Sequence, residues 1–444
     1  MPLSMELVQA IRVRQNNGLP EEILEKARLH IKDTVAISLA AYKRAPIAKQ
    51  AIAALSIGTS GSAKVIGSSL RLPPGHAAFS NTALAHALDF DDINDLSRIH
   101  PTPVTLAAAI AAADIGKSPA VDLVTAVALG NEILCRMGRA VEPKGIGADA
   151  NWFLSQLFGY FGAAITAGLV LGLSDEELVH AIGLAYMQAS GGKEAGVGTG
   201  SQARSIYPAF ASMGGVQAAL LASQGVTAPA SSLDGPTGFF PIYFGQNLDV
   251  HQREILLDTD SWTFSDTSIK LFPSCRYSHP FIKSALILRD KMDLSEIKKI
   301  VIGVNETAAM LCRPLADRCR PRTLQDAKFS IPFMVAFTFV HGRVDLNNLT
   351  EKALDDPEVL QLAALIEVEP TQHDAPGLPP GDIRMFSEAQ EHQYTHILGP
   401  ETAVDEVKDK FIQCCKYAGI AAPDILWEKL SRQMDYGLVN ACII

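Results

Sequence analysis

The sequence has few cysteines, and their spacing is not typical of a metal site. Only seven occur among 444 residues, and none forms a CxxC pair. Structural zinc and iron–sulfur sites require closely spaced cysteines, and disulfide frameworks belong to short, cysteine-rich secreted chains. We therefore expect reduced thiols, a cytoplasmic location and no metal ion. The cysteines are Cys135, Cys275, Cys312, Cys319, Cys414, Cys415 and Cys442.

The sequence also lacks an excess of positive charge. It has 38 Lys and Arg against 48 Asp and Glu, which gives a formal net charge of −10. Proteins that bind nucleic acids or anionic membranes normally carry a basic patch, so we expect neither partner. The N-terminal segment "MPLSMELVQAIRVRQNNG" has no continuous apolar run, so it does not resemble a secretory signal peptide.

Only one long uncharged stretch raises the question of a membrane span. Residues 150–174 read "ANWFLSQLFGYFGAAITAGLVLGLS", and a transmembrane helix needs about 20 predominantly apolar residues. However, Asn151, Ser155 and Gln156 interrupt its beginning, and glycine and alanine fill much of the remainder. We interpret the stretch as a helix of small residues buried among other helices.

Hydrophobic residues are abundant, at 48% of the chain against 19% charged, so a sizeable core can form. The first half shows repeated helical periodicity, as in "LPEEILEKARLHIKDTVAISLAA". Further helices are expected to begin at Ser118 and at Ser174, where Glu177 completes a capping box. Alanine and glycine dominate these helix faces, which predicts closely packed helices.

The pattern changes near residue 266. A β-branched run at residues 297–305 predicts a buried strand, and "ALIEVEP", "GDIRMF" and "QYTHILG" predict further strands around one helix, "DAKFSIPFMVAFTFVHG". Helical patterns resume after residue 400. We predict a mainly α fold in which a large all-helical domain, 1–265, is followed by an inserted smaller α+β lid domain, 266–400. The C-terminal helices, 401–444, would return to the helical domain.

An acidic segment, "ALDFDDINDLSRIHPTP" at residues 87–103, lies between two alanine-rich helical patterns. Pro101 and Pro103 predict an extended connection before the next helix, which places this segment on a loop. Buried carboxylates are costly unless paired. Helix capping and pairing with Arg98 would explain any single aspartate, whereas the cluster with His100 predicts a polar pocket for acid–base chemistry. The aspartates are Asp89, Asp91, Asp92 and Asp95.

Two further segments concentrate chemically useful residues. In "SIKLFPSCRYSHP", Lys270, Arg276 and His279 predict a cationic pocket or a proton-transfer group, and an ordinary solvated turn is the alternative. Cys275 is disfavoured as a nucleophile because no third residue orients a base beside it. In "GTGSQARSIYP", residues 198–208, a glycine-rich turn and Arg204 could hold an anion.

Several segments, in order, resemble the MmgE/PrpD family, which includes 2-methylcitrate dehydratase, cis-aconitate decarboxylase and iminodisuccinate epimerase. The matching segments are "HALDFDD…HP" (86–101), "GYFGAAITAGLVLGLS" (159–174), "AIGLAYMQASG" (181–191), "KLFPSC" (270–275) and "PRTLQDAKFSIPF" (321–333). Each alone is modest, but the ordered set is specific and extends over nearly the whole chain.

The resemblance implies a helical domain and a lid domain with the active site between them, a homodimer, and no cofactor. It also implies proton removal next to a carboxylate of a small polycarboxylic acid. The resulting anion would expel water, lose carbon dioxide or be reprotonated. By position, the implied catalytic residues are Lys270, His100, Asp91 and Tyr207. The implied substrate-binding residues are Asp89, Arg204, Phe153, Ser155, Arg276 and His279.

This sequence departs from the family pattern at two acid–base positions. A "WHPT"-like stretch is here "WFLS", so Phe153 replaces a histidine and Ser155 replaces a threonine. A "TKPLH" stretch is here "ARSIY", so Arg204 replaces a lysine and Tyr207 a histidine. Arginine still binds carboxylates but carries protons poorly, and tyrosine can donate a proton. These changes predict a less polar pocket, fewer carboxylates on the substrate or a different reaction.

Three functions remain open from the sequence. The first is a lyase or isomerase that removes a proton next to a carboxylate, either of a small polycarboxylic acid or, in a specialised pathway, of a larger and more apolar acid that Phe153 would face. The second is an epimerase of an iminodisuccinate-like acid, which the spacing from Asp91 to His100 and the "PSC" after Lys270 favour. The third is a degenerate, non-catalytic member that binds an acidic metabolite.

Overall fold

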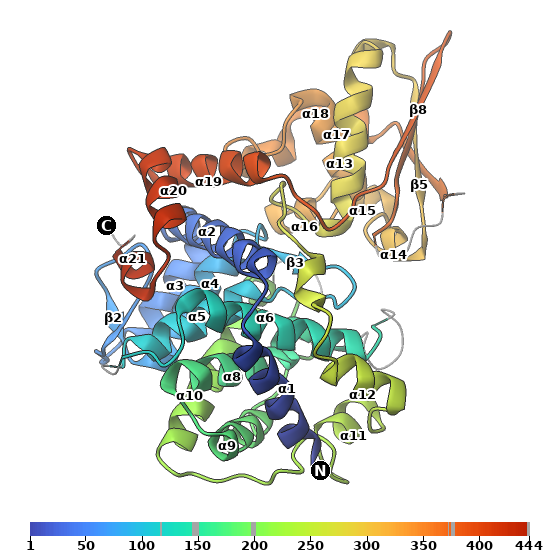
Figure 1. Ribbon diagram of the computed structural model, residues 1–444. Coiled ribbons are helices and arrows are strands. Elements are labelled where there is room, and N and C mark those ends of the chain that lie inside the picture. The colour runs from blue at the N-terminus through green and yellow to red at the C-terminus, as the bar shows by residue number, and fades with distance from the viewer. Residues whose placement is uncertain (116–117, 144–150, 197–200, 372, 374–377, 442–444) are drawn as a thin grey trace. The chain divides into compact units, whose positions relative to one another are not determined.

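Figure 1 shows the computed structural model, which describes residues 1–444 except 116–117, 144–150, 197–200, 372, 374–377 and 442–444. Cys442 and the glycines of the predicted anion turn, Gly198 and Gly200, lie outside the described residues. The protein is 59% helix and 8% strand, with its main sheet near the C-terminus. The predicted mainly α class is therefore confirmed, while the lid arrangement stays a prediction.

The described residues form two compact units. Unit 1 comprises the described parts of 1–269 and 400–441, and unit 2 those of 270–399. The sequence analysis placed the domain boundaries between residues 265 and 266 and between residues 400 and 401. The helices of unit 1 are α1 (Leu3–Asn17), α2 (Glu21–Arg44), α3 (Pro46–Leu55), α4 (Pro74–His86), α5 (Thr102–Ala113), α6 (Leu123–Ala140), α7 (Leu154–Leu157), α8 (Gly159–Leu171), α9 (Asp175–Tyr186), α10 (Tyr207–Ser223), α11 (Phe239–Phe244), α12 (Val250–Leu257), α19 (Val404–Ala418), α20 (Pro423–Arg432) and α21 (Tyr436–Ala441).

Short strands and 3-10 turns complete unit 1. The antiparallel pairs are β1 (Ala63–Lys64) with β2 (Arg71–Leu72), and β3 (Ile93–Asn94) with β4 (Thr267–Ser268). The 3-10 turns are η2 (Lys193–Gly196), η3 (Ala203–Ser205) and η4 (Thr263–Asp266).

Helix α8 lies at the centre of unit 1, where it packs against α5, α6, α9 and α10 (Figure 1). The sequence allows this because small residues let the helix backbones approach closely. At Gly215 on α10, an added Cβ would lie 2.4 Å from the Ala163 Cβ and 2.7 Å from both the Ala164 nitrogen and the Tyr160 carbonyl oxygen of α8. Helix α10 begins at Tyr207, so this contact also positions a predicted site residue.

We expect Gly215→Ala to destabilise the protein by about 1–3 kcal/mol, because backbone atoms of α8 must move to admit the methyl group. The higher helix propensity of alanine, roughly 1 kcal/mol, offsets part of this loss. Urea denaturation measures the difference. Gly192→Ala is the matched control, since an added Cβ there meets no atom within 4 Å. Equal stability of the two variants would contradict the close α8–α10 packing.

Unit 2 is built around a four-stranded sheet in the order β6-β5-β7-β8. The pair β5–β6 is parallel, and β5–β7 and β7–β8 are antiparallel. Helix α13 packs against β7, β8 and α17 (Figure 1). Predicted strands at all four positions are confirmed. The elements are η5 (Arg276–Ser278), α13 (His279–Leu288), η6 (Arg289–Lys291), η7 (Leu294–Glu296), β5 (Lys299–Val304), α14 (Glu306–Ala309), α15 (Leu315–Cys319), α16 (Leu324–Lys328), α17 (Ile331–His341), η8 (Glu351–Asp355), α18 (Pro357–Ala363), β6 (Ile366–Pro370), β7 (Gly381–Phe386) and β8 (Glu391–His396).

Some helix boundaries differ from the sequence prediction, while the capping box of Ser174 and Glu177 is confirmed. Helix α6 begins at Leu123 rather than near Ser118, because the Asp122 side chain caps it. Helix α5 begins at Thr102, since its prolines occupy the cap and first turn, where no amide donor is needed. The helix expected across 326–342 is divided into α16 and α17, and Ser330 caps the second.

The apolar stretch considered as a membrane span is part of the core. Residues 154–171 have the length and hydropathy of a span, but 94% of this window is buried inside the protein. The stretch comprises α7 and α8. The prediction of a buried helix of small residues is confirmed.

Candidate active site

The acidic segment connects two buried helices of unit 1, as the sequence predicted. Helix α4 ends at His86 and α5 begins at Thr102. Between them, β3 pairs with β4, and Asn94 also pairs with Ile99. Asp89 and Arg98 have left-handed φ values of 54° and 55°, which non-glycine residues rarely adopt. The loop is therefore fixed by both helices and by a strand pair.

Two histidines share one aspartate on this loop. Nδ1 of His86 lies 2.8 Å from Oδ2 of Asp91, and Nδ1 of His100 lies 3.1 Å from the same oxygen. Nδ1 of His100 also lies 2.6 Å from the Asp92 carbonyl oxygen. The Asp91 side chain is fully buried, while that of His100 keeps 12% of its surface exposed. Pairing with these imidazoles replaces the pairing with Arg98 that the sequence allowed for Asp91.

The buried carboxylate of Asp91 determines which ring nitrogen of each imidazole faces it. Burial by itself raises the pKa of Asp91, but the charges and hydrogen bonds of His86 and His100 outweigh it and hold the pKa well below its usual range. An ionised carboxylate only accepts hydrogen bonds, so each Nδ1 donates. Nε2 is then the ring nitrogen through which each imidazole can exchange a proton with a substrate. This arrangement orients two imidazoles for proton transfer.

Asp92 has a supporting role that the sequence did not reveal. Its Oδ2 lies 2.7 Å from Nδ1 of His30 and accepts a short hydrogen bond from the Thr102 hydroxyl. Its Oδ1 accepts from the Thr102 amide at 3.3 Å. Asn131 donates to the same Thr102 hydroxyl at 2.9 Å. Asp92 thus ties the loop to α2, α5 and α6 and fixes the carbonyl group that His100 contacts.

Aromatic side chains adjoin the histidine pair. The Tyr207 ring lies edge-to-face with His86, with centroids 4.9 Å apart, and stacks on Phe153 at 4.3 Å. Arg204 lies 5.5 Å from the centroid of Phe153. Burial raises the pKa of the Tyr207 phenol above its usual value, although a hydrogen bond with Ser155 opposes the shift. The phenol therefore keeps its proton and can only donate it.

Ser155 links this aromatic group to the loop, because its hydroxyl accepts a 2.9 Å hydrogen bond from the His100 amide. Asp89 is also buried, and its amide donates to the His86 carbonyl oxygen at 2.9 Å. The structure therefore brings together seven residues in unit 1 that the sequence singled out. They are Asp89, Asp91, His100, Phe153, Ser155, Arg204 and Tyr207.

His86 is the main functional residue that the sequence argument omitted from its site. His86 lies within a segment that resembles the family, but it also falls inside the helical pattern of α4, so no separate role was predicted for it. Its position five residues before Asp91, at the last residue of α4, is the signal that could have identified it. His30 and Asn131 offered no signal, since they lie on helices remote in sequence.

Lys270, Arg276 and His279 belong to unit 2, where all three are buried. Arg276 donates to the Gly399 carbonyl oxygen at 3.1 Å. His279 begins α13 and lies edge-to-face with Phe272 at 5.1 Å. The alternative of a solvated turn is wrong for this segment, because these side chains are not in solvent. Their catalytic and binding roles stay predictions.

His86, Asp91 and His100 could also hold a metal ion, since each offers one ligand atom and these atoms lie within 4.8 Å of one another. Two imidazoles and a carboxylate suit zinc, whose bonds of about 2.0–2.1 Å separate tetrahedral ligand atoms by roughly 3.3 Å. The two spacings to Asp91, 2.8 and 3.1 Å, are instead those of hydrogen bonds. The described geometry therefore fits a proton-transfer cluster better than a metal centre.

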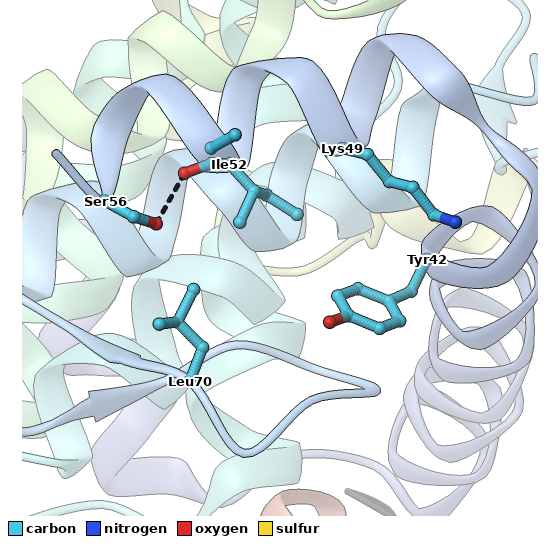
Figure 2. A pocket seen from close by; sticks show the side chains of 6 residues that line it. Tyr42, Lys49, Ile52, Ser56 and Leu70 are labelled. Carbon is cyan, nitrogen blue, oxygen red and sulfur yellow. Dashed lines mark hydrogen bonds between the residues drawn. The ribbon is translucent and has the colours of Figure 1, made fainter.

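A separate hollow lies where α2, α3 and the β1–β2 hairpin meet (Figure 2). Of its lining residues, only Lys49 is charged, and none offers a carboxylate or an imidazole. The hollow therefore lacks the carboxylate–imidazole pairing found on the acidic loop. Its lining residues are Tyr42, Lys49, Ile52, Ala53, Ser56 and Leu70.

Known proteins similar to this chain are carboxylic-acid lyases by name. Cis-aconitate decarboxylase of Aspergillus terreus is 25% identical over 391 residues, which cover 83% of this chain and 79% of that protein. Human cis-aconitate decarboxylase is 25% identical over 331 residues, 72% of this chain and 64% of that protein. The 2-methylcitrate dehydratase of Escherichia coli K12 is 24% identical over 373 residues, 80% and 75% of the two chains.

Family descriptions match both parts of the chain. The MmgE/PrpD N-terminal domain matches residues 6–251, and the MmgE/PrpD C-terminal domain matches residues 272–424. These matches account for most of the sequence and include the acidic loop and its partner helices, so this protein belongs to the MmgE/PrpD family.

Proposed function

We propose that this protein is a lyase that removes a proton next to a carboxylate of a small polycarboxylic acid, without an organic cofactor. The observation that carries the proposal is the buried Asp91 carboxylate shared by two imidazoles, beside a phenol that keeps its proton. The names of the similar proteins, decarboxylase and dehydratase, support the same reaction class. A purely binding protein would have no need of two imidazoles oriented by one buried charge.

In the proposed reaction, an imidazole Nε2 takes a proton from the carbon next to the substrate carboxylate. The electron pair left on that carbon delocalises into the carboxylate, and Arg204 stabilises the added negative charge. Collapse of this anion then expels hydroxide from the neighbouring carbon as water, with the proton supplied by Tyr207 or by the imidazolium. In a decarboxylation, the carbon–carboxylate bond breaks in place of the C–H bond: carbon dioxide leaves, its bonding electron pair stays on the carbon, and Tyr207 or an imidazolium then donates one proton to that carbon.

Proton NMR in D2O with a panel of citrate-, aconitate-, methylcitrate- and aspartate-like acids tests this proposal. New vinyl signals together with deuterium on carbon are expected for a lyase. Deuterium exchange alone would replace the lyase by the isomerase or epimerase that the loop spacing favours. A folded protein that gives neither signal with any acid would contradict C–H acid catalysis and favour the metabolite-binding alternative.

Lys270→Ala tests the acid–base role that the family resemblance implies for Lys270. We expect kcat to fall by roughly 10²–10⁴-fold, the usual contribution of a positioned acid or base. Steady-state kinetics and ligand-induced thermal shifts, measured on the same acids, separate turnover from affinity. If the wild type shows no turnover and Lys270→Ala only weakens ligand binding, the result would indicate a binding protein.

A further inference from the structure

Lys410 connects the C-terminal helix α19 to the middle of the acidic loop. Its Nζ lies 2.7 Å from Oδ1 of Asp33 on α2 and donates a 2.7 Å hydrogen bond to the Phe90 carbonyl oxygen. The ammonium also lies 3.9 Å from the centroid of the Phe90 ring. Phe90 stands between Asp89 and Asp91, so one side chain holds the loop backbone between two candidate site residues.

Stability alone is a poor explanation for this ion pair. The side chains of Lys410 and Asp33 are 3% and 0% exposed, and the desolvation of two such charges costs several kcal/mol. Burial raises the pKa of Asp33 to about 7, even though Lys410 opposes the shift. Apolar residues of similar volume often pack two helices equally well. The contact with the Phe90 carbonyl is what apolar residues could not supply.

The loop backbone needs such support next to Phe90. Asp89 has a φ of 54°, and a non-glycine residue in this region is strained unless its surroundings hold it there. The amide of Asp89 is held by the His86 carbonyl oxygen at 2.9 Å. The carbonyl group of the next residue, Phe90, is held by its hydrogen bond from Lys410. Asp91 is the next residue, and its carboxylate orients both imidazoles.

We propose that Lys410 and Asp33 are positioning residues that set the geometry of the acidic loop and thereby of the His86–Asp91–His100 cluster. Lys410 acts through the Phe90 backbone, and Asp33 acts by holding Lys410. The effect of this pair on turnover rests on the proposed function. Its effect on the imidazoles does not.

The double variant Lys410→Met/Asp33→Leu tests the proposal, because it removes both charges together and leaves neither one buried alone. We expect kcat to fall roughly 10- to 100-fold through misplacement of the cluster, with KM changed only a few-fold and the melting temperature near that of the wild type. The single variant Lys410→Arg keeps the positive charge and the hydrogen-bond donor, so its kcat should lie between those of the double variant and the wild type.

Lys32→Met is the matched control. Lys32 is a second buried lysine between α2 and the C-terminal helices, where it donates to Ser431 at 2.7 Å and lies 4.2 Å from the Trp427 ring centroid. Ser431 and Trp427 both lie on α20 and not on the acidic loop. This variant disturbs the same helix junction and should keep the wild-type kcat.

The imidazole N–H signals of ¹⁵N-histidine-labelled protein report the cluster without turnover. We expect the signals of His86 and His100 to shift in the double variant and to stay in place in Lys32→Met. Unchanged signals in the double variant would overturn the proposal, whether or not kcat falls. If the wild type turns over none of the acids, the proposed function fails, and the imidazole signals alone decide the positioning role.

Discussion

Asp91→Asn is expected to lower kcat by roughly 10²–10⁴-fold while KM changes little. The side chain keeps its size but loses the charge that both imidazoles share through Oδ2. The amide oxygen can still accept from both Nδ1–H groups, but it carries no negative charge, so it holds the two imidazoles less strongly in this tautomer and stabilises an imidazolium poorly during proton transfer. Steady-state kinetics and deuterium incorporation into the substrate measure the loss.

Asp114→Asn is the matched control for this prediction. Asp114 caps the C-terminal end of α5, at the opposite end from the cluster, where its Oδ2 accepts a 2.9 Å hydrogen bond from the Lys64 amide. Asp114→Asn changes a carboxylate at the far end of α5 without touching an imidazole, so kcat should stay near that of the wild type. An Asp91→Asn variant that also kept kcat within a few-fold would exclude the shared carboxylate from the mechanism.

Much of the fold follows from local patterns in the sequence. Helix α9 begins where a serine and a glutamate three residues apart predict a capping box, and the β-branched run that forms β5 needs no partner to be recognised. The shifted start of α6 shows the limit of such patterns. Ser118 and Asp122 are both residues that can cap a helix, and in the structure it is the Asp122 side chain that does so, by accepting from the Thr125 amide.

The candidate site was predictable as a set of residues but not as a set of contacts. The acidic loop, its position between two helices and most of its side chains follow from the sequence. The pairing of each aspartate does not, because it depends on how His100 folds back within the loop and on how α2 and α4 place His30 and His86 against it. Asp91 pairs with His86, Asp92 pairs with His30, and the two neighbouring aspartates consequently have different roles. No local pattern distinguishes a carboxylate that orients imidazoles from one that ties helices together.

In the structure, two departures from the family pattern that lie far apart in the sequence are in contact with each other. Phe153 and Tyr207 each replace a histidine of the family pattern, and their rings stack at 4.3 Å. Two positions associated with proton transfer have therefore become one aromatic contact beside His86. In the proposed mechanism, the imidazole pair and the Tyr207 hydroxyl carry the proton transfers assigned to unit 1, which makes this hydroxyl a sensitive test of the mechanism.

Tyr207→Phe removes only that hydroxyl and keeps the ring that stacks on Phe153. We expect kcat to fall by roughly 10²-fold, the lower range for the loss of a general acid. Because burial raises the pKa of Tyr207, the wild-type phenol stays protonated through the neutral range. The pH profiles of kcat/KM for variant and wild type should therefore run parallel, with the variant displaced to lower values.

Tyr436→Phe provides the matched control, because it removes another hydroxyl from unit 1. That phenol donates a 3.0 Å hydrogen bond to the Val121 carbonyl oxygen, and burial raises its pKa as well. If buried phenols only support the fold, both variants should lose similar stability and neither should lose kcat. If Tyr207 donates a proton, only its variant loses kcat. A Tyr207→Phe profile that lost a limb on the alkaline side would instead show that Tyr207 titrates during turnover, against the protonated phenol inferred from its burial.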